Sequence, residues 1–301
     1  MSRNFKELLN ARWANNQLVC VGLDSDLNKL PTCLNPTTSV LEAQLVFNMC
    51  IIDATHRYAC AFKPNRAFYV ALGKTGVRVL ADTIAYIQAV SPDVPVILDA
   101  KVADIDNTNL GYTQEAFEIL GADALTVHPY LGAEAMRPYL DMADKGIIVL
   151  VRTSNKGAGE FQDLVITQEN GTTLPLYQHV ATRVAEAWNY NGNCAVVAGA
   201  TYPSELAEIR QIVGDMPILI PGVGAQGGDL EGSIRAGIGP NNWGMIINNS
   251  RGIIFASNGE DFAEAAGEMA RQMNMQMITQ KNVMTANAAV GQPKGEVRKC
   301  T

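Results

Sequence analysis

The chain has 301 residues, of which 48% are hydrophobic and 18% are charged, and its formal net charge is −7. This composition excludes a disordered protein, and the negative charge argues against a broad surface for nucleic acid or anionic membranes. The longest apolar runs, such as residues 146–151 and 218–223, are too short to span a membrane. The N-terminal segment also lacks the apolar core of a signal peptide, so we expect a soluble protein that is not exported.

The six cysteines show neither a C-x-x-C pair nor a cluster with histidine at zinc-ligand spacing. Several of them lie inside apolar runs, where a free cysteine behaves as a small hydrophobic residue. This use of cysteine is typical of a reducing compartment, so we expect a cytoplasmic protein.

Short apolar runs alternate with helix-period segments between residues 17 and 277. Eight of the runs have the length of strands rather than helices. The expected strands are residues 18–23, 59–63, 94–99, 124–128, 147–153, 194–198, 218–223 and 245–249. Between them, apolar residues recur at helical spacing, as in 77–87 and 206–213, and Gly121 and Gly214 stand where two of the helices should end.

The predicted strands are apolar on both faces, as expected where helices cover a parallel sheet. Eight β–α units within about 250 residues are the count and size of a (β/α)8 TIM barrel, although a doubly wound open sheet would show the same alternation. We therefore predict an α/β protein with a single (β/α)8 TIM barrel domain over residues 1–279, including an N-terminal helix.

Two segments fall outside the β–α alternation. Residues 154–174, after the fifth predicted strand, are rich in polar residues and glycine and are too long for an ordinary loop. Loops of this length are usually lids or disordered segments, so we assign a lid insertion there. Residues 280–301 mix Gly, Pro, Asn and Lys without an apolar period, which predicts a C-terminal surface extension.

The densest polar cluster follows the third predicted strand, where the reactive groups of a barrel gather. Period-two geometry places Asp99 and Lys101 on the same face of this strand. Lys63 ends the neighbouring strand and Asp104 follows closely, so we expect a Lys–Asp–Lys–Asp alternation in which every member stays ionised. The alternative is an ion-pair network that only closes the barrel, and charges at the mouth of the barrel make that interpretation weaker.

A second signal is the glycine-rich segment 221–228, which follows the seventh predicted strand. Backbone N–H groups without a neighbouring Cβ can approach an anion closely, and Arg251, after the eighth strand, could clamp the same anion. Loops after strands 7 and 8 bind phosphate in many barrels, whereas the alternative is a pair of simple turns with a solvated arginine. The glycines also match G-x-G-x-x-G, but no acidic residue closes the next strand, so we reject a dinucleotide site.

Other polar residues at strand ends carry weaker signals. His128 is as well explained by a structural hydrogen bond as by catalysis. Asp24 and Asp26 end the first strand and suggest a metal, but nothing else supplies metal-ligand spacing and Lys63 would repel a cation. We therefore expect no metal site.

The motifs together resemble the orotidine 5'-phosphate decarboxylase family. Residues 99–105 with Asn107 and Thr108 are similar to its signature, and segments near strands 2, 5, 7 and 8 resemble its longer, type 2 form. These segments are residues 62–65 with 67–69, 153–155, 221–229 and 250–253. The resemblance implies conversion of orotidine 5'-phosphate to UMP and CO2 in de novo pyrimidine synthesis. It also implies a homodimer with shared active sites, no metal or organic cofactor, and no nucleic-acid or membrane partner.

The resemblance also implies catalytic roles for four charged residues. Lys101 would donate the proton to C6 of the substrate, and Asp99 would face the carboxylate that is lost. Lys63 would hold the ribose and the charge network together with Asp24. Asp104 would reach across the dimer interface into the partner's site.

The remaining roles implied by the resemblance concern substrate binding. Thr108 would cross the dimer interface with Asp104. Ser154 and Gln226 would contact the base and close the lid. Gly224 and Arg251 would bind the phosphate.

Two rival functions remain compatible with the sequence. The first is a Mg²⁺-dependent phosphosugar decarboxylase or aldolase of the same barrel suprafamily, which resembles this barrel but carries an acidic metal ligand near the end of the second strand. Lys63 stands in that region here and argues against it. The second is a catalytically silent phosphate-binding barrel, whose expected sign is the loss of a charged site residue, and none is missing.

Overall fold

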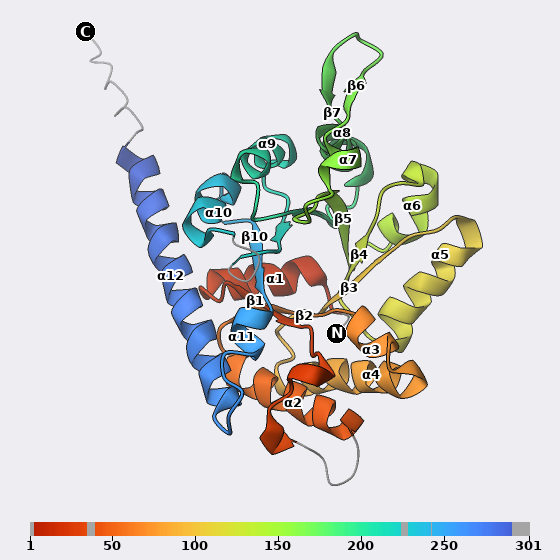
Figure 1. The fold of residues 1–301 in the computed structure, drawn as a ribbon. Helices are drawn as coiled ribbons and strands as arrows, with labels where there is room; N and C mark the ends of the chain where they lie inside the picture. Colours follow the sequence, from red (N-terminus) through yellow and green to blue (C-terminus); the bar gives the residue numbers. More distant parts are fainter. Residues whose placement is uncertain (1–2, 35–39, 224–227, 242, 291–301) are drawn as a thin grey trace.

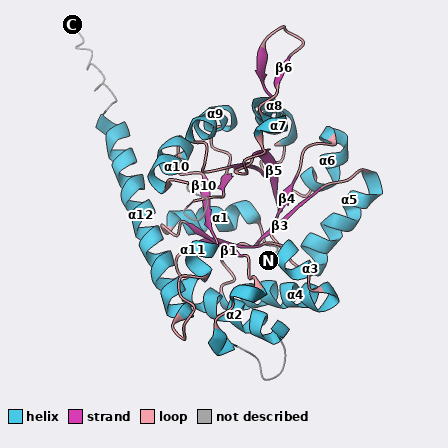
Figure 2. Cartoon of the chain, in the orientation of Figure 1, coloured by secondary structure: helices cyan, strands magenta, loops and turns pink. Residues whose placement is uncertain are grey.

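The computed structural model describes residues 3–34, 40–223, 228–241 and 243–290. In this part of the chain, eight parallel strands form one sheet in the order β2-β1-β10-β9-β8-β5-β4-β3, with helices packed around it (Figure 1, Figure 2). The strands are β1 (Val19–Leu23), β2 (Ala59–Pro64), β3 (Ile97–Val102), β4 (Ala124–Val127), β5 (Gly146–Arg152), β8 (Cys194–Ala198), β9 (Ile218–Ile220) and β10 (Met245–Asn249). Bridges from Phe62 to Val96 and from Asn65 to Asp99 join the two outer strands. The sheet is thereby closed, and the predicted (β/α)8 TIM barrel is confirmed.

Every predicted strand has a counterpart in the barrel, and β8 and β10 match the prediction to the residue. The largest difference is β3, which begins three residues later than expected and continues to Val102. Its continuation reflects a shift in register, because Leu98 pairs with Leu125 whereas Val102 pairs with Val127. Residues 99–101 thus leave the regular ladder at the mouth of the barrel.

Helices cover the strands from outside, which is why β1, β2, β4 and β8 are buried along their whole length. The predicted helical periods at 77–87 and 206–213 lie in α4 (Gly73–Val90) and α9 (Pro203–Val213). Gly214 ends α9 with a φ of 58°, a conformation that glycine adopts readily. The other helices around the barrel are α2 (Val40–Thr55), α3 (Ala67–Val70), α5 (Asp106–Thr113), α6 (Gly132–Leu140), α8 (Leu176–Arg183), α10 (Leu230–Gly237) and α11 (Arg251–Ile254).

The predicted N-terminal helix is α1 (Phe5–Ala14), which lies against the N-terminal ends of the strands. Its Arg12 is buried and donates through Nε to the carbonyl of Ala59 at the start of β2, at 2.8 Å. At the start of β5, a Cβ on Gly146 would approach the ring of Phe5 to 2.2 Å, so only glycine lets the helix pack this closely. Helix α1 thus covers the end of the barrel at which the strands begin.

The insertion after β5 is folded. It contains the short helix α7 (Gly159–Gln162) and an antiparallel hairpin of β6 (Val165–Thr167) and β7 (Thr173–Pro175), which projects from the barrel in Figure 1. The hairpin forms a two-stranded sheet of its own. A loop of this length was expected to be either a lid or a disordered segment. The helix and the hairpin exclude a segment that lacks secondary structure throughout.

The boundary predicted at residue 280 falls inside a helix. The last helix, α12 (Phe262–Val290), runs along one side of the barrel and continues past that position (Figure 1). Residues 280–290 contain neither Gly nor Pro, the residues that most disfavour a helix. The helix therefore continues there although the segment has no apolar period. Residues 280–290 of the predicted surface extension are therefore helical, and 291–301 lie outside the described residues. Among the described helices, none is both long and apolar enough to cross a membrane.

Candidate active site

A cavity of about 530 Å³ opens at the C-terminal ends of the barrel strands. Each of the eight barrel strands, or the residues just after it, contributes to its lining. The lining includes Asp24, Lys63, Asn65, Asp99, Lys101, Thr126, Thr153, Ser154, Asn155, Gln162, Val197, Pro221, Gly222, Asn248, Asn249, Ser250 and Arg251. Six of the predicted site residues are thereby brought together from five different strand ends.

A chain of three charged side chains lies in this cavity. Asp99 accepts from Lys63 Nζ at 2.7 Å through Oδ2 and from Lys101 Nζ at 2.5 Å through Oδ1. The side chain of Lys63 is 3% exposed, whereas that of Lys101 is 47% exposed. Asp99 therefore separates one buried ammonium from a second ammonium that is accessible from the cavity.

Burial and charge act in opposite directions on the buried pair. Burial alone would lower the pKa of Lys63, but the neighbouring carboxylates of Asp99 and Asp24 outweigh it and raise that pKa above its ordinary value. Burial alone would raise the pKa of Asp99, but Lys63 and Lys101 outweigh it and hold that pKa well below its ordinary range. Lys63 and Asp99 are therefore both charged at neutral pH.

Asp24 follows β1 and lines the cavity on the same side as Lys63. Its Oδ1 is buried and has no hydrogen-bond partner among the described residues. A buried carboxylate oxygen without a donor is costly, so such an atom is suited to accept a hydrogen bond from a bound molecule.

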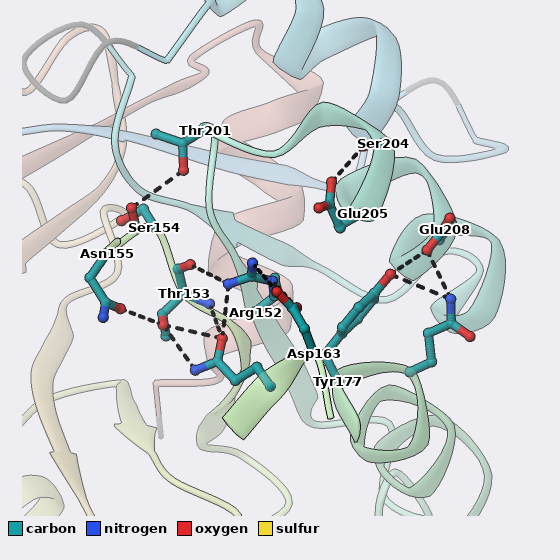
Figure 3. A network of polar contacts seen from close by, with 12 residues as sticks. Arg152, Thr153, Ser154, Asn155, Asp163, Tyr177, Thr201, Ser204, Glu205 and Glu208 are labelled. Atoms are coloured by element: carbon teal, nitrogen blue, oxygen red, sulfur yellow. Dashed lines mark hydrogen bonds and ion pairs between the residues drawn. The ribbon is translucent and has the colours of Figure 1, made fainter. Parts of the chain in front are cut away.

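The insertion is attached to the cavity through Arg152 at the end of β5 (Figure 3). This arginine is 3% exposed, donates from Nη2 to Asp163 at 3.0 Å, and stacks over the ring of Tyr202 at 4.1 Å. Gln162 of α7 accepts from the backbone N–H of Thr153 at 2.9 Å and lines the cavity itself. Ion pairing and stacking thus fix the base of the insertion beside the opening.

The opposite wall comes from the ends of β9 and β10. Gly222 has a φ of 100°, which favours glycine, and Ser250 and Arg251 lie beside it in the lining. Arg251 is exposed and has no ion-pair partner among the described residues. Of the predicted anion-binding residues, Gly224 lies outside the described residues, as does Gln226.

Asp104 and Thr108 are not among the residues that line the cavity of this chain. They lie at the N-terminal end of α5, where Asp104 Oδ1 accepts from the backbone N–H of Ile105 at 2.8 Å. Exposed apolar residues on or directly before α5 and α6, two helices that contact each other, are here called the α5–α6 patch. It consists of the exposed residues Ile105, Leu110, Tyr130 and Leu131.

Comparison with known proteins agrees with this geometry. A model of the Orotidine 5'-phosphate decarboxylase / HUMPS family matches residues 17–266. The chain belongs to this family. An orotidine 5'-phosphate decarboxylase of Ralstonia pickettii is 49% identical over 269 residues, covering 88% of this chain and 95% of its own. One from Cellvibrio japonicus is 47% identical over 272 residues, covering 90% and 97%. The structure of Leishmania donovani OMP decarboxylase has a TM-score of 0.76 at 36% identity, covering 91% and 99%.

Family motifs do not single out every residue of the cavity. Thr126 and Gln162 line it, but the sequence offered no signal for either. Thr126 stands in the apolar run of β4, where a β-branched residue is expected for packing alone. Gln162 lies within the insertion, whose fold could not be read from its composition. In the described residues, no group of three or more His, Cys, Asp and Glu side chains could hold a metal ion.

Proposed function

We propose that the cavity converts orotidine 5'-phosphate to UMP and CO2, a carboxy-lyase reaction of pyrimidine biosynthesis. The observation that carries this proposal is the chain Lys63–Asp99–Lys101, with its exposed ammonium in a cavity that also contains Arg251. An anionic substrate can bind through its phosphate at Arg251 and meet a fixed pair of opposite charges at its other end. The relatives named above act on the same substrate according to their names.

The reaction requires a carbanion to be stabilised without an electron sink in the substrate ring. The bond between C6 and the carboxylate breaks, CO2 leaves, and the electron pair remains on C6. Lys101 lies close to this carbon, stabilises the developing charge through its ammonium and transfers a proton to C6. Asp99 faces the carboxylate that is lost and holds Lys101 in place at 2.5 Å. Lys101 then regains a proton from solvent.

The ribose, the base and the phosphate of the substrate are bound by other residues of the cavity and of the loops beside it. Lys63 and the unpartnered oxygen of Asp24 hold the ribose hydroxyls. Ser154 and Gln226 contact the base, and Gly224 and Arg251 hold the phosphate. Residues 154–174 act as the lid, so that binding energy from the remote phosphate is used to close the site around the reacting carbon.

The Mg²⁺-dependent phosphosugar alternative is not favoured. The relatives described above are named orotidine 5'-phosphate decarboxylases. Lys63 is buried at the end of β2, where its ammonium would repel a divalent cation. The two functions differ in substrate and also in whether turnover requires a divalent cation.

We expect UMP formation from orotidine 5'-phosphate to proceed at the same rate with and without EDTA, because the charge on the carbanion is balanced by Lys101 alone. The measurement is the absorbance change of the pyrimidine during turnover, after prolonged dialysis against the chelator. Activity that disappears with EDTA and returns with Mg²⁺ would contradict the proposal and favour the phosphosugar enzymes.

Substituting Arg251 by alanine is expected to weaken binding of both UMP and the substrate about 10- to 100-fold, because a charge-assisted hydrogen bond to phosphate is lost. Uridine, which lacks the phosphate, should bind both proteins equally. Arg271→Ala is a matched control, since Arg271 is an exposed arginine of α12 paired with Glu268 away from the cavity. Calorimetric titration measures all of these affinities, and an unchanged UMP affinity in Arg251→Ala would rule out the phosphate assignment.

We also propose that the protein is a cytoplasmic homodimer with shared active sites. Asp104 and Thr108 lie beside the α5–α6 patch, outside the cavity of their own chain. Burying this apolar patch against a second copy would remove its side chains from water and carry both polar residues toward the neighbouring cavity.

A further inference from the structure

Thr126 is a polar residue in an otherwise apolar strand. It lies in β4 between Leu125 and Val127 and is 1% exposed. Its hydroxyl contacts three groups of β3, the strand that carries Asp99 and Lys101. It accepts from the backbone N–H of Ala100 at 2.9 Å and of Lys101 at 3.0 Å, and it donates to Asp99 Oδ1 at 3.0 Å.

These contacts lie where the regular pairing of β3 with β4 is interrupted. Between its pairings with Leu125 and Val127, β3 advances from Leu98 to Val102, so it contains two more residues than the facing segment of β4. The backbone N–H groups of Ala100 and Lys101 therefore have no regular partner in the ladder. The hydroxyl of Thr126 accepts from both and takes the place of the missing carbonyls.

The hydrogen-bonding capacity of this hydroxyl is fully used. A threonine hydroxyl has one proton to donate and two lone pairs to accept with. Both lone pairs are occupied by backbone N–H groups, so the proton has to point at Asp99 Oδ1. The same oxygen of Asp99 accepts from Lys101 Nζ, so one hydroxyl orients the carboxylate that orients the ammonium.

The backbone at Lys101 needs such support. Its φ is 53°, in the left-handed region that residues with a Cβ rarely adopt. A residue keeps this conformation only when its surroundings hold it there. The backbone N–H of Lys101 donates to Thr126 of β4, and the ammonium of Lys101 donates to Asp99. Lys101 is therefore held at both its backbone and the end of its side chain.

We propose that Thr126 is a positioning residue for the decarboxylation, acting through Asp99 and Lys101 rather than on the substrate. This inference rests on the proposed function of the cavity. It assigns to one hydroxyl the task of fixing both the backbone and the carboxylate on which the proton donor depends.

The test compares Thr126→Val, which keeps the shape and removes the hydroxyl, with Thr126→Ser, which keeps the hydroxyl. We expect Thr126→Val to lower kcat about 100-fold, because a reacting group displaced by about 1 Å loses this much rate. Its affinity for UMP should stay within about threefold of wild type, since the phosphate and ribose contacts remain. Thr126→Ser should recover most of the lost turnover.

A matched control is Thr55→Val, because Thr55 is also a fully buried threonine but its hydroxyl bonds only to the carbonyl of Ile51 in its own helix. All rates are expressed per folded protein, with thermal melting followed in parallel. A purely structural role would lower the melting temperature of Thr126→Val and leave kcat of the folded fraction unchanged, which would overturn the inference. If the wild-type protein formed no UMP, the proposed function itself would be contradicted.

Discussion

Replacing Lys101 by alanine should lower kcat by about 10⁴-fold or more, since both the charge that stabilises the carbanion and the proton that quenches it are lost. UMP affinity should change far less, because the product carries no charge on C6 for the ammonium to stabilise. The fold should persist, since Lys101 is about half exposed and Asp99 keeps its bond to Lys63. Stopped assays for UMP and calorimetric titration separate the two effects.

A matched control for this variant is Lys74→Ala. Lys74 is an exposed lysine of α4, outside the cavity lining, and its substitution removes the same charge. It should leave both turnover and affinity unchanged. A Lys101→Ala protein that retained more than about one hundredth of wild-type kcat would show that another group donates the proton.

Mixing Lys101→Ala with Asp104→Ala protein should restore about a quarter of wild-type activity, although each variant alone is expected to be nearly inactive. Lys101 lines the cavity of its own chain and is proposed to act there, whereas Asp104 lies outside it and is proposed to serve the partner. In a hybrid dimer, one site then collects both defects and the other collects none. Random exchange makes half of the dimers hybrid, so one site in four is intact.

The control for the mixing experiment is a mixture of Lys101→Ala with Asp99→Ala, two residues of the same cavity. Every site in that mixture carries at least one defect, so no activity should return. Subunit exchange is verified with differently tagged chains. If exchange is complete and the first mixture also stays inactive, Asp104 serves its own subunit and the shared-site proposal fails.

The eight strands could be predicted because they are short, apolar on both faces and separated by helical periods. The prediction was least accurate at β3, which was expected at 94–99 but begins at Ile97 and reaches Val102. The prediction ended the apolar run at Asp99, the first charged residue that follows it. The backbone N–H groups of Ala100 and Lys101 are bonded there by Thr126, a residue of another strand, and no local pattern reports such a contact.

The site could be predicted in part. Chain order alone placed Lys63, Asp99 and Lys101 at neighbouring strand ends, and the structure joins them through a single carboxylate. Period-two geometry was nevertheless an incomplete explanation of where the side chain of Lys101 points. That geometry assumes an extended backbone, whereas the backbone of Lys101 is left-handed. Sequence alone also gave no indication that Arg152 would anchor the insertion, since its partner Asp163 lies within the polar segment itself.

The β6–β7 hairpin pairs only with itself, so none of the barrel registers depends on its length. Its turn between Thr167 and Thr173 is the tip of the hairpin, which projects from the barrel in Figure 1. A dye or a short peptide tag grafted into that turn would therefore leave the eight-stranded core undisturbed. Such a label would report the proposed movement of the lid as an optical signal during single turnovers.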